Sequence, residues 1–112
     1  MKNIIYVKDL DLGAIAQTEQ PTKEVSEIFN GERRRMVEVK LTNGAVLSKH
    51  KAAEPITVLC LSGSGTFRAG SDLEESQKLS PGTLITLESG VEHDVTAEPA
   101  VRILVTKFKG DR

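Results

Sequence analysis

Two histidines are the residues most suited to chemistry in this 112-residue sequence. They are His50 and His93, and an imidazole can bind a metal ion or exchange a proton near neutral pH. Glu54 shares parity with His50 in an extended chain, so it could complete a set of two histidines and one carboxylate for a divalent metal. Pro55 follows directly and leaves the local geometry of Glu54 open. Any site built on both histidines needs elements that bring positions 50 and 93 together.

The segments on the N-terminal side of His50 have the pattern of paired strands. Residues 35–41 alternate between apolar and polar side chains, as expected of a strand with one buried face. Asn43-Gly44 supplies the two positive-φ positions of a tight hairpin turn, and residues 45–49 lead back toward His50. Asn30-Gly31 predicts a second such turn, between residues 25–29 and the strand that begins near position 33.

The rest of the chain continues this strand pattern. Residues 56–61 form a nearly continuous apolar run, which is typical of a strand covered on both faces. Gly63 and Gly65 predict a turn after it, and Pro81-Gly82 has the order that a type II turn prefers. Further strands are predicted at residues 66–69, 75–79, 83–87, 93–97 and 101–108. About nine short strands without a convincing helix predict an all-β, antiparallel sandwich or barrel.

Composition limits the classes of function. The formal net charge is −1, so a nucleic-acid partner is not expected, and we interpret Arg33-Arg34-Arg35 as a solvated strand end. Cys60 is the only cysteine and lies in an apolar run, so no intrachain disulfide forms and a buried thiol is expected. The apolar run at residues 4–7 is too short for a signal peptide or a membrane span. We therefore expect a cytoplasmic protein without a membrane partner.

With these elements in place, the spacing of glycines and histidines resembles that of the cupins, which are small jelly-roll β-barrels. Their first motif is glycine, five residues, histidine, one residue, histidine, three or four residues, glutamate, six residues and glycine. Gly44, His50 and Gly63 match it, whereas Ala52 replaces the second histidine and Ile56 the glutamate. The resemblance implies one domain over residues 1–112, with residues 35–108 as the barrel (double-stranded β-helix) core and residues 1–24 as an N-terminal arm or strand.

The second cupin motif is glycine, five residues, proline, one residue, glycine, two residues, histidine, three residues and asparagine. Gly82, Gly90 and His93 match it, whereas Glu88 replaces the proline and Ala97 the asparagine. Metal-binding cupins use the two motifs to hold iron, manganese, nickel, zinc or copper with three histidines and a glutamate. The resemblance thus implies that only His50 and His93 remain of four ligands, and we expect no metal cofactor, with a divalent metal held by His50, His93 and Glu54 as the alternative.

Strand alternation then predicts the other side chains around the histidines. Ile56, Val58 and Cys60 share a face with His50, so we expect a mostly apolar pocket with two polar groups, the usual composition of a small-molecule site. Arg35 has the parity of the apolar side chains on its strand. It could therefore lie at the barrel mouth and bind a carboxylate or a phosphate.

Three functions remain open at this point. The leading hypothesis is a small stand-alone cupin whose barrel binds an unidentified small molecule and whose usual metal site is degraded, as a sensor, a binding protein or an enzyme of undefined activity. The alternative is a metal-dependent oxygenase or isomerase that uses His50, His93 and Glu54. The third is a dimeric interaction or assembly module. The resemblance implies a homodimer, with Ile4–Val7 as a candidate segment to pack across the interface.

Overall fold

The chain is almost entirely strand and connecting loop. The computed structural model describes residues 3–110, and within this range there are seven strands and no helix. The strands are β1 (Thr22–Asn30), β2 (Arg34–Thr42), β3 (Val46–His50), β4 (Ile56–Ala69), β5 (Glu75–Leu79), β6 (Leu84–Leu87) and β7 (His93–Phe108). All of their pairings are antiparallel, which confirms the predicted all-β antiparallel fold. No helix that could cross a membrane occurs among the described residues.

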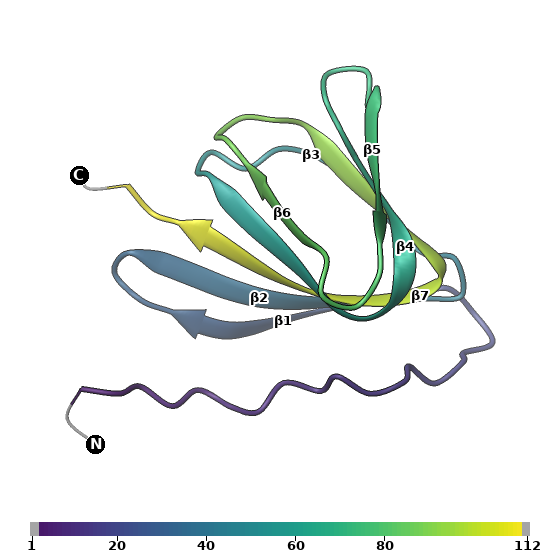
Figure 1. The fold of residues 1–112 in the computed structure, drawn as a ribbon, viewed down its shortest axis with the longest axis horizontal. Helices are drawn as coiled ribbons and strands as arrows, with labels where there is room; N and C mark the ends of the chain where they lie inside the picture. Colours follow the sequence, from purple (N-terminus) through teal and green to yellow (C-terminus); the bar gives the residue numbers. More distant parts are fainter. Residues whose placement is uncertain (1–2, 111–112) are drawn as a thin grey trace.

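The two longest strands, β4 and β7, hold the sheet together. The sheet order is β1-β2-β7-β4-β5, while β3 also pairs with β7 and β6 with β4. The first half of β4 pairs with β6 and with the end of β7, and its second half pairs with β5 and with the start of β7. Each long strand therefore belongs to both parts of the sheet, and Figure 1 shows the sheet curling on itself between them.

The core fills the inside of this curled sheet. Alternate residues of β2, namely Val37, Val39 and Leu41, are buried and face buried partners on the neighbouring β7. The remaining core residues are Ala45, Ile56, Val58, Cys60, Phe67, Leu79, Val95, Ala97, Val101, Ile103 and Val105. Burying such aliphatic side chains stabilises a fold by about 1.5–3 kcal/mol each, so alternation fixes which face of every strand points inward.

The prediction of nine short strands was wrong in two places. Residues 56–61 and 66–69 belong to the single strand β4, and residues 93–97 and 101–108 belong to β7. Gly63 and Gly65 do not form a turn, because the pairing with β7 merely shifts its register there, from Val101 to Ala97. The extra residues bulge and bend the strands without ending them, which glycine spacing alone does not reveal.

The predicted hairpin turns had mixed outcomes. Asn43 and Gly44 have φ values of 50° and 73°, which confirms the predicted turn between β2 and β3. Gly82 has a φ of 94°, as the Pro81-Gly82 prediction requires. Asn30-Gly31 was wrong as a two-residue turn, because neither residue has a positive φ. β1 and β2 are instead joined by residues 31–33, and the Gly31 N–H donates to the Arg34 carbonyl oxygen at 2.9 Å.

Residues 3–21 run alongside the sheet without forming a strand (Figure 1). Arg102, only 6% exposed, holds this N-terminal arm, since its Nη1 donates to the carbonyl oxygens of Asp11 and Gly13 at 3.2 and 3.3 Å. The apolar residues 4–7 stay largely exposed. Strict alternation along β4 would place Leu61 on the face opposite to Ile56, but Leu61 is buried within the chain, because the register shift after Cys60 interrupts the alternation.

Candidate functional site

The fold brings the two histidines side by side. His50 is the last residue of β3, His93 is the first of β7, and the two are directly paired across the strands. Their ring centroids are 4.2 Å apart and the rings meet edge to face at 61°. His50 is exposed, whereas His93 is 4% exposed and stacks on Phe67 with ring centroids 5.5 Å apart. One imidazole therefore faces solvent and the other closes the apolar interior.

Backbone carbonyl groups orient both rings in the same way. The Nδ1 atom of His50 lies 2.7 Å from the Ser48 carbonyl oxygen, and that of His93 lies 3.0 Å from the Val91 carbonyl oxygen. A carbonyl oxygen can only accept, so each Nδ1 must carry the proton and donate. In a neutral imidazole this leaves a lone pair on Nε2. The site thus presents two hydrogen-bond acceptors that can also take up a proton or bind a metal.

The surroundings of His93 favour its neutral form. Burial lowers the pKa of His93 below its usual value near 6.5, and the hydrogen bond to Val91 opposes this shift. Electrostatic repulsion of an added proton by the nearby His50 and Lys107 lowers the pKa of His93 further, and the nearby Asp94 carboxylate raises it. His93 is therefore an uncharged acceptor at neutral pH.

A small cavity of about 50 Å³ lies beneath the histidines. Its lining includes Ile56 and Val58, which share a face of their strand, and also Ala52, which stands at a usual cupin ligand position. The other lining residues are Leu47, His50, Lys51, Phe67, His93, Val95, Ile103, Val105 and Lys107. Since one water molecule takes up about 30 Å³ in the liquid, this cavity holds no more than a very small chemical group.

Cys60 shares the inward face of β4 with Ile56 and Val58 but does not line the cavity. It lies one inward position deeper, is 1% exposed, and its Sγ donates to the Ser62 carbonyl oxygen at 3.6 Å. Burial raises the pKa of its thiol, and the bond to Ser62 only partly offsets this. Cys60 is thus a core residue in this structure. Strand alternation correctly placed it on the inward face, but alternation does not tell how far a residue lies from the mouth of the barrel.

The structure does not bring Glu54 to the histidines. Within residues 3–110, no three His, Cys, Asp or Glu side chains come together in a way that could hold a metal ion. The parity prediction for Glu54 fails because β3 ends at His50 and residues 51–55 are not extended strand. The residues present therefore offer two metal ligands, fewer than the three that catalytic sites normally use.

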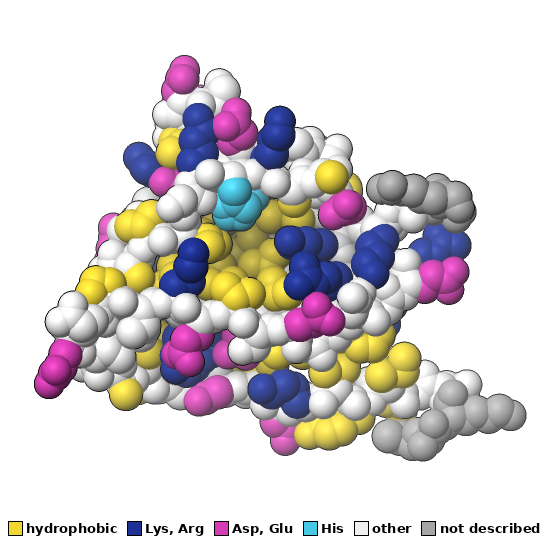
Figure 2. All heavy atoms as spheres, turned by 180° about the vertical axis from the view of Figure 1, so that it is seen from behind, with side chains coloured by type: hydrophobic (Ala, Val, Ile, Leu, Met, Phe, Trp, Pro, Cys, Tyr) yellow, Lys and Arg dark blue, Asp and Glu magenta, His cyan; other side chains and the backbone are white. Residues whose placement is uncertain are grey.

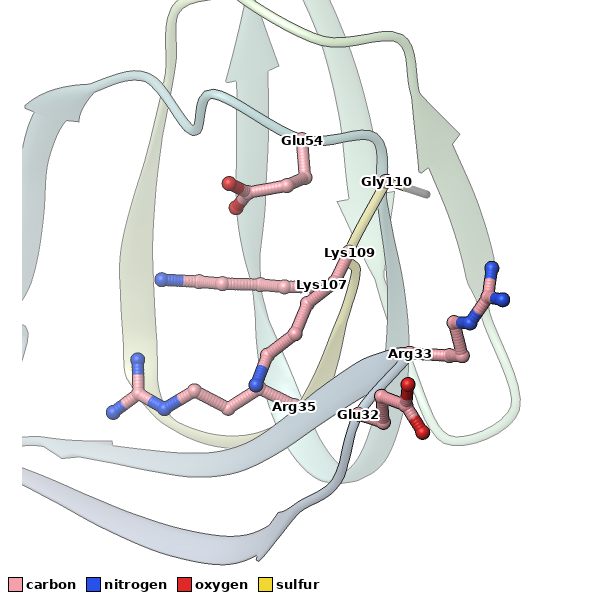
Figure 3. A pocket seen from close by; sticks show the side chains of 7 residues that line it. All are labelled: Glu32, Arg33, Arg35, Glu54, Lys107, Lys109 and Gly110. Carbon is pink, nitrogen blue, oxygen red and sulfur yellow. The ribbon is translucent and has the colours of Figure 1, made fainter. Parts of the chain in front are cut away.

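Glu54 instead lines a larger cleft next to the histidines. This cleft has a volume of about 490 Å³ and is lined by Glu32, Arg33, Arg35, Glu54, Lys107, Lys109 and Gly110. Figure 3 shows that Arg35, Glu54, Lys107 and Lys109 reach into it, while Glu32 and Arg33 point away from them. Arg35 was expected at the barrel mouth, and it lies in this cleft and not in the histidine cavity.

Lys107 connects the two spaces, because it lines both the cleft and the histidine cavity. In Figure 2 the surface of the molecule has a hollow with an apolar floor, a histidine at its rim, and lysine or arginine side chains on two sides. Sequence reasoning missed Lys107 and Lys109. The signal was available, because Lys107 continues the inward parity of Val101, Ile103 and Val105 on β7.

Comparison with known proteins gives the fold a name. No family model and no curated protein matches the sequence. Among solved structures, a Streptococcus pyogenes protein of unknown function is similar, with 22% identity, a TM-score of 0.76, and coverage of 99% of this chain and 95% of that one.

Two cupins are similar over a comparable length. A cupin superfamily protein of Desulfitobacterium hafniense is 14% identical, with a TM-score of 0.75 and 97% of both chains covered. An RmlC-like cupin of Desulfovibrio desulfuricans is 20% identical, with a TM-score of 0.75 and coverage of 92% of this chain and 95% of that one. This similarity, together with the antiparallel barrel, shows that the protein has the double-stranded β-helix fold of the cupins.

Proposed function

We propose that the protein binds a small molecule at the mouth of its barrel, with His50 and His93 as polar contacts. The observation that carries this proposal is the shared orientation of the two rings. Both Nδ1 atoms are bound to backbone carbonyl oxygens 2.7 and 3.0 Å away, so both Nε2 atoms are available to a ligand. Two acceptors beside an apolar wall are typical of a small-molecule site.

The chemistry of the site defines what such a ligand must offer. A hydroxyl or an N–H group can donate to a histidine Nε2, and a small apolar group fits the cavity of about 50 Å³. Either histidine can also accept a proton from a bound molecule, so the same geometry suits a general base. Whether binding alone or proton transfer follows depends on the acidity of the ligand.

A screen of small alcohols, amides and carboxylates by NMR tests this proposal. We expect binders to shift the backbone amide signals of His50, His93 and Val95, which surround the cavity. His50→Phe keeps a ring at an exposed position but removes both nitrogens, so it should weaken binding without unfolding the chain. The proposal fails if no compound shifts these signals, or if His50→Phe and His93→Phe both bind as tightly as the original protein.

We also propose that the protein is a homodimer in which the N-terminal arm packs against a second copy. The supporting observation is that Ile4, Ile5 and Tyr6 are 64, 66 and 67% exposed in a single chain. Three consecutive large apolar side chains in contact with water favour association, because burying them removes apolar surface from solvent. β1 is the edge strand of the sheet and Val25 on it is 56% exposed, which extends the apolar surface.

A further inference from the structure

The cleft beside the barrel places like charges directly opposite each other. Arg35 on β2 is paired in register with Lys107 on β7, and paired residues of antiparallel strands point to the same face. Like charges in this arrangement normally destabilise a sheet. Arg35 is compensated by an ion pair with Glu27 at 3.0 Å. Lys107 has no ion pair with any residue between 3 and 110, so its positive charge at the mouth of the barrel is not balanced by one.

A third cation is held in place next to this pair. The Lys109 Nζ donates to the Gly31 carbonyl oxygen at 2.7 Å and to the Asn30 side-chain oxygen at 2.5 Å. An ammonium group has three protons, so this lysine keeps one donor for another partner. Figure 3 shows Arg35, Lys107 and Lys109 in the cleft with Glu54 above them. The lining of the cleft contains four cations and two carboxylates, so the cleft is positive although the whole chain has a formal net charge of −1.

The two adjoining spaces differ in size and in polarity. The cleft measures about 490 Å³, which is large enough for a small metabolite, whereas the histidine cavity measures about 50 Å³. Lys107 lines both, so a molecule can contact the cleft cations and the apolar cavity at once. The charged group of such a molecule would lie in the cleft, and its short apolar or hydroxyl-bearing end would reach the histidines.

We propose that the ligand of this protein is a small organic anion, a carboxylate or a phosphate ester, held by Arg35, Lys107 and Lys109. This inference rests on the proposed function and adds the class of ligand. An anion between Arg35 and Lys107 relieves their repulsion and forms charge-assisted hydrogen bonds, which are stronger than neutral ones. The cleft is open to solvent, so added salt should weaken the binding.

Calorimetric titration with four probes tests the proposal on the full-length protein. Butanoate and butyl phosphate carry an anion and a short apolar chain, butanamide is the neutral equivalent of butanoate, and inorganic phosphate has no apolar end. We expect at least one of the two organic anions to bind about tenfold more tightly than butanamide, since one charge-assisted hydrogen bond accounts for roughly that factor. We expect the same anion to bind more tightly than inorganic phosphate, and the comparison of butanoate with butyl phosphate identifies the preferred anion.

Lys107→Met and Lys78→Met form a matched pair of variants. Lys107→Met removes the charge but keeps an unbranched chain, and should weaken binding of the preferred anion about tenfold. Lys78→Met makes the same change on β5, at a residue that pairs with Glu98 and lines neither space, and should leave binding unchanged.

Two results would overturn the ligand class: butanamide binding as tightly as both organic anions, or Lys107→Met binding them as tightly as the original protein. In either case small molecules that still shift the histidine signals would leave the proposed barrel function standing. Conversely, anion binding that depends on Lys107 but not on His50 or His93 would support the basic cleft and contradict a role for the histidines. Failure of every anion to bind would overturn the ligand class.

Discussion

At the scale of single residues, the orientation of the two histidines decides their chemistry. Each Nδ1 donates to a carbonyl oxygen two positions earlier in the chain, Ser48 for His50 and Val91 for His93. The backbone thus selects the tautomer locally, without a carboxylate partner. Both Nε2 atoms are left as acceptors, and this feature depends on backbone geometry that residue spacing does not show.

His93 predicts a pH dependence of stability. Its pKa is lowered in the folded state, mainly by burial, so the unfolded chain binds the proton more readily. The contribution of His93 to stability is therefore fully present above the unfolded pKa, about 6.5, and declines as the pH falls below it toward the folded pKa. Urea unfolding between about pH 5 and pH 7.5 measures the effect. His93→Gln should flatten this part of the profile, and an unchanged slope would contradict the prediction.

The two-ligand arrangement predicts little metal in the purified protein. No described carboxylate joins the histidines, so affinity for a first-row metal should be too weak to survive purification. Elemental mass spectrometry of protein made without a histidine tag should find much less than one metal ion per chain. One metal ion per chain, lost in both His50→Ala and His93→Ala, would show that the metal alternative is correct.

At the scale of elements, an alanine substitution at Gly63 tests whether this residue lies in a bulge of a continuous strand or in an open turn. Gly63 and Gly44 have similar φ values, 79° and 73°, so alanine at either position meets a similar backbone strain of about 1–2 kcal/mol. A Cβ at Gly63 would lie 2.1 Å from the Ala100 carbonyl oxygen, whereas one at Gly44 would have no atom within 4 Å. Crowding of this kind adds about 1–3 kcal/mol.

We therefore expect Gly63→Ala to destabilise the protein clearly more than Gly44→Ala. Chemical denaturation of both variants measures the difference in the free energy of unfolding. Equal losses of stability would place Gly63 in an open turn, as its spacing from Gly65 first suggested, and would contradict the continuous strand β4.

The same elements show what the sequence could predict. Alternation located β2 and the inward face of Ile56, Val58 and Cys60 on β4, because burial of one face requires a period of two, whereas turn signals bounded β5 and β6. Glycine spacing did not separate a turn from a bulge, since both need the same conformational freedom. Parity also failed for Glu54, because the strand that contains His50 ends there. The basic cleft was missed because its residues come from segments far apart, at positions 32–35, 54 and 107–110.

At the scale of the whole molecule, the N-terminal arm predicts the oligomeric state. Sedimentation at micromolar concentration should show a dimer, because residues 4–7 expose apolar side chains that a second copy can cover. Deleting residues 1–10 should give a folded monomer, since Asp11 and Gly13, which bind Arg102, remain. The control is Lys8→Gln, which changes the charge of the arm and keeps its apolar side chains. A monomeric full-length protein would contradict the prediction.

The path of β7 has one more consequence. This strand of 16 residues begins with His93 and carries Lys107 near its other end, yet both residues line one cavity of about 50 Å³. A ligand that contacts both acts as a non-covalent cross-link between the two ends of a single strand. Local unfolding of the segment of β7 between these two ends would then require release of the ligand first. Bound ligand should consequently slow hydrogen exchange along all of β7 and the strands paired with it, well beyond the residues in contact.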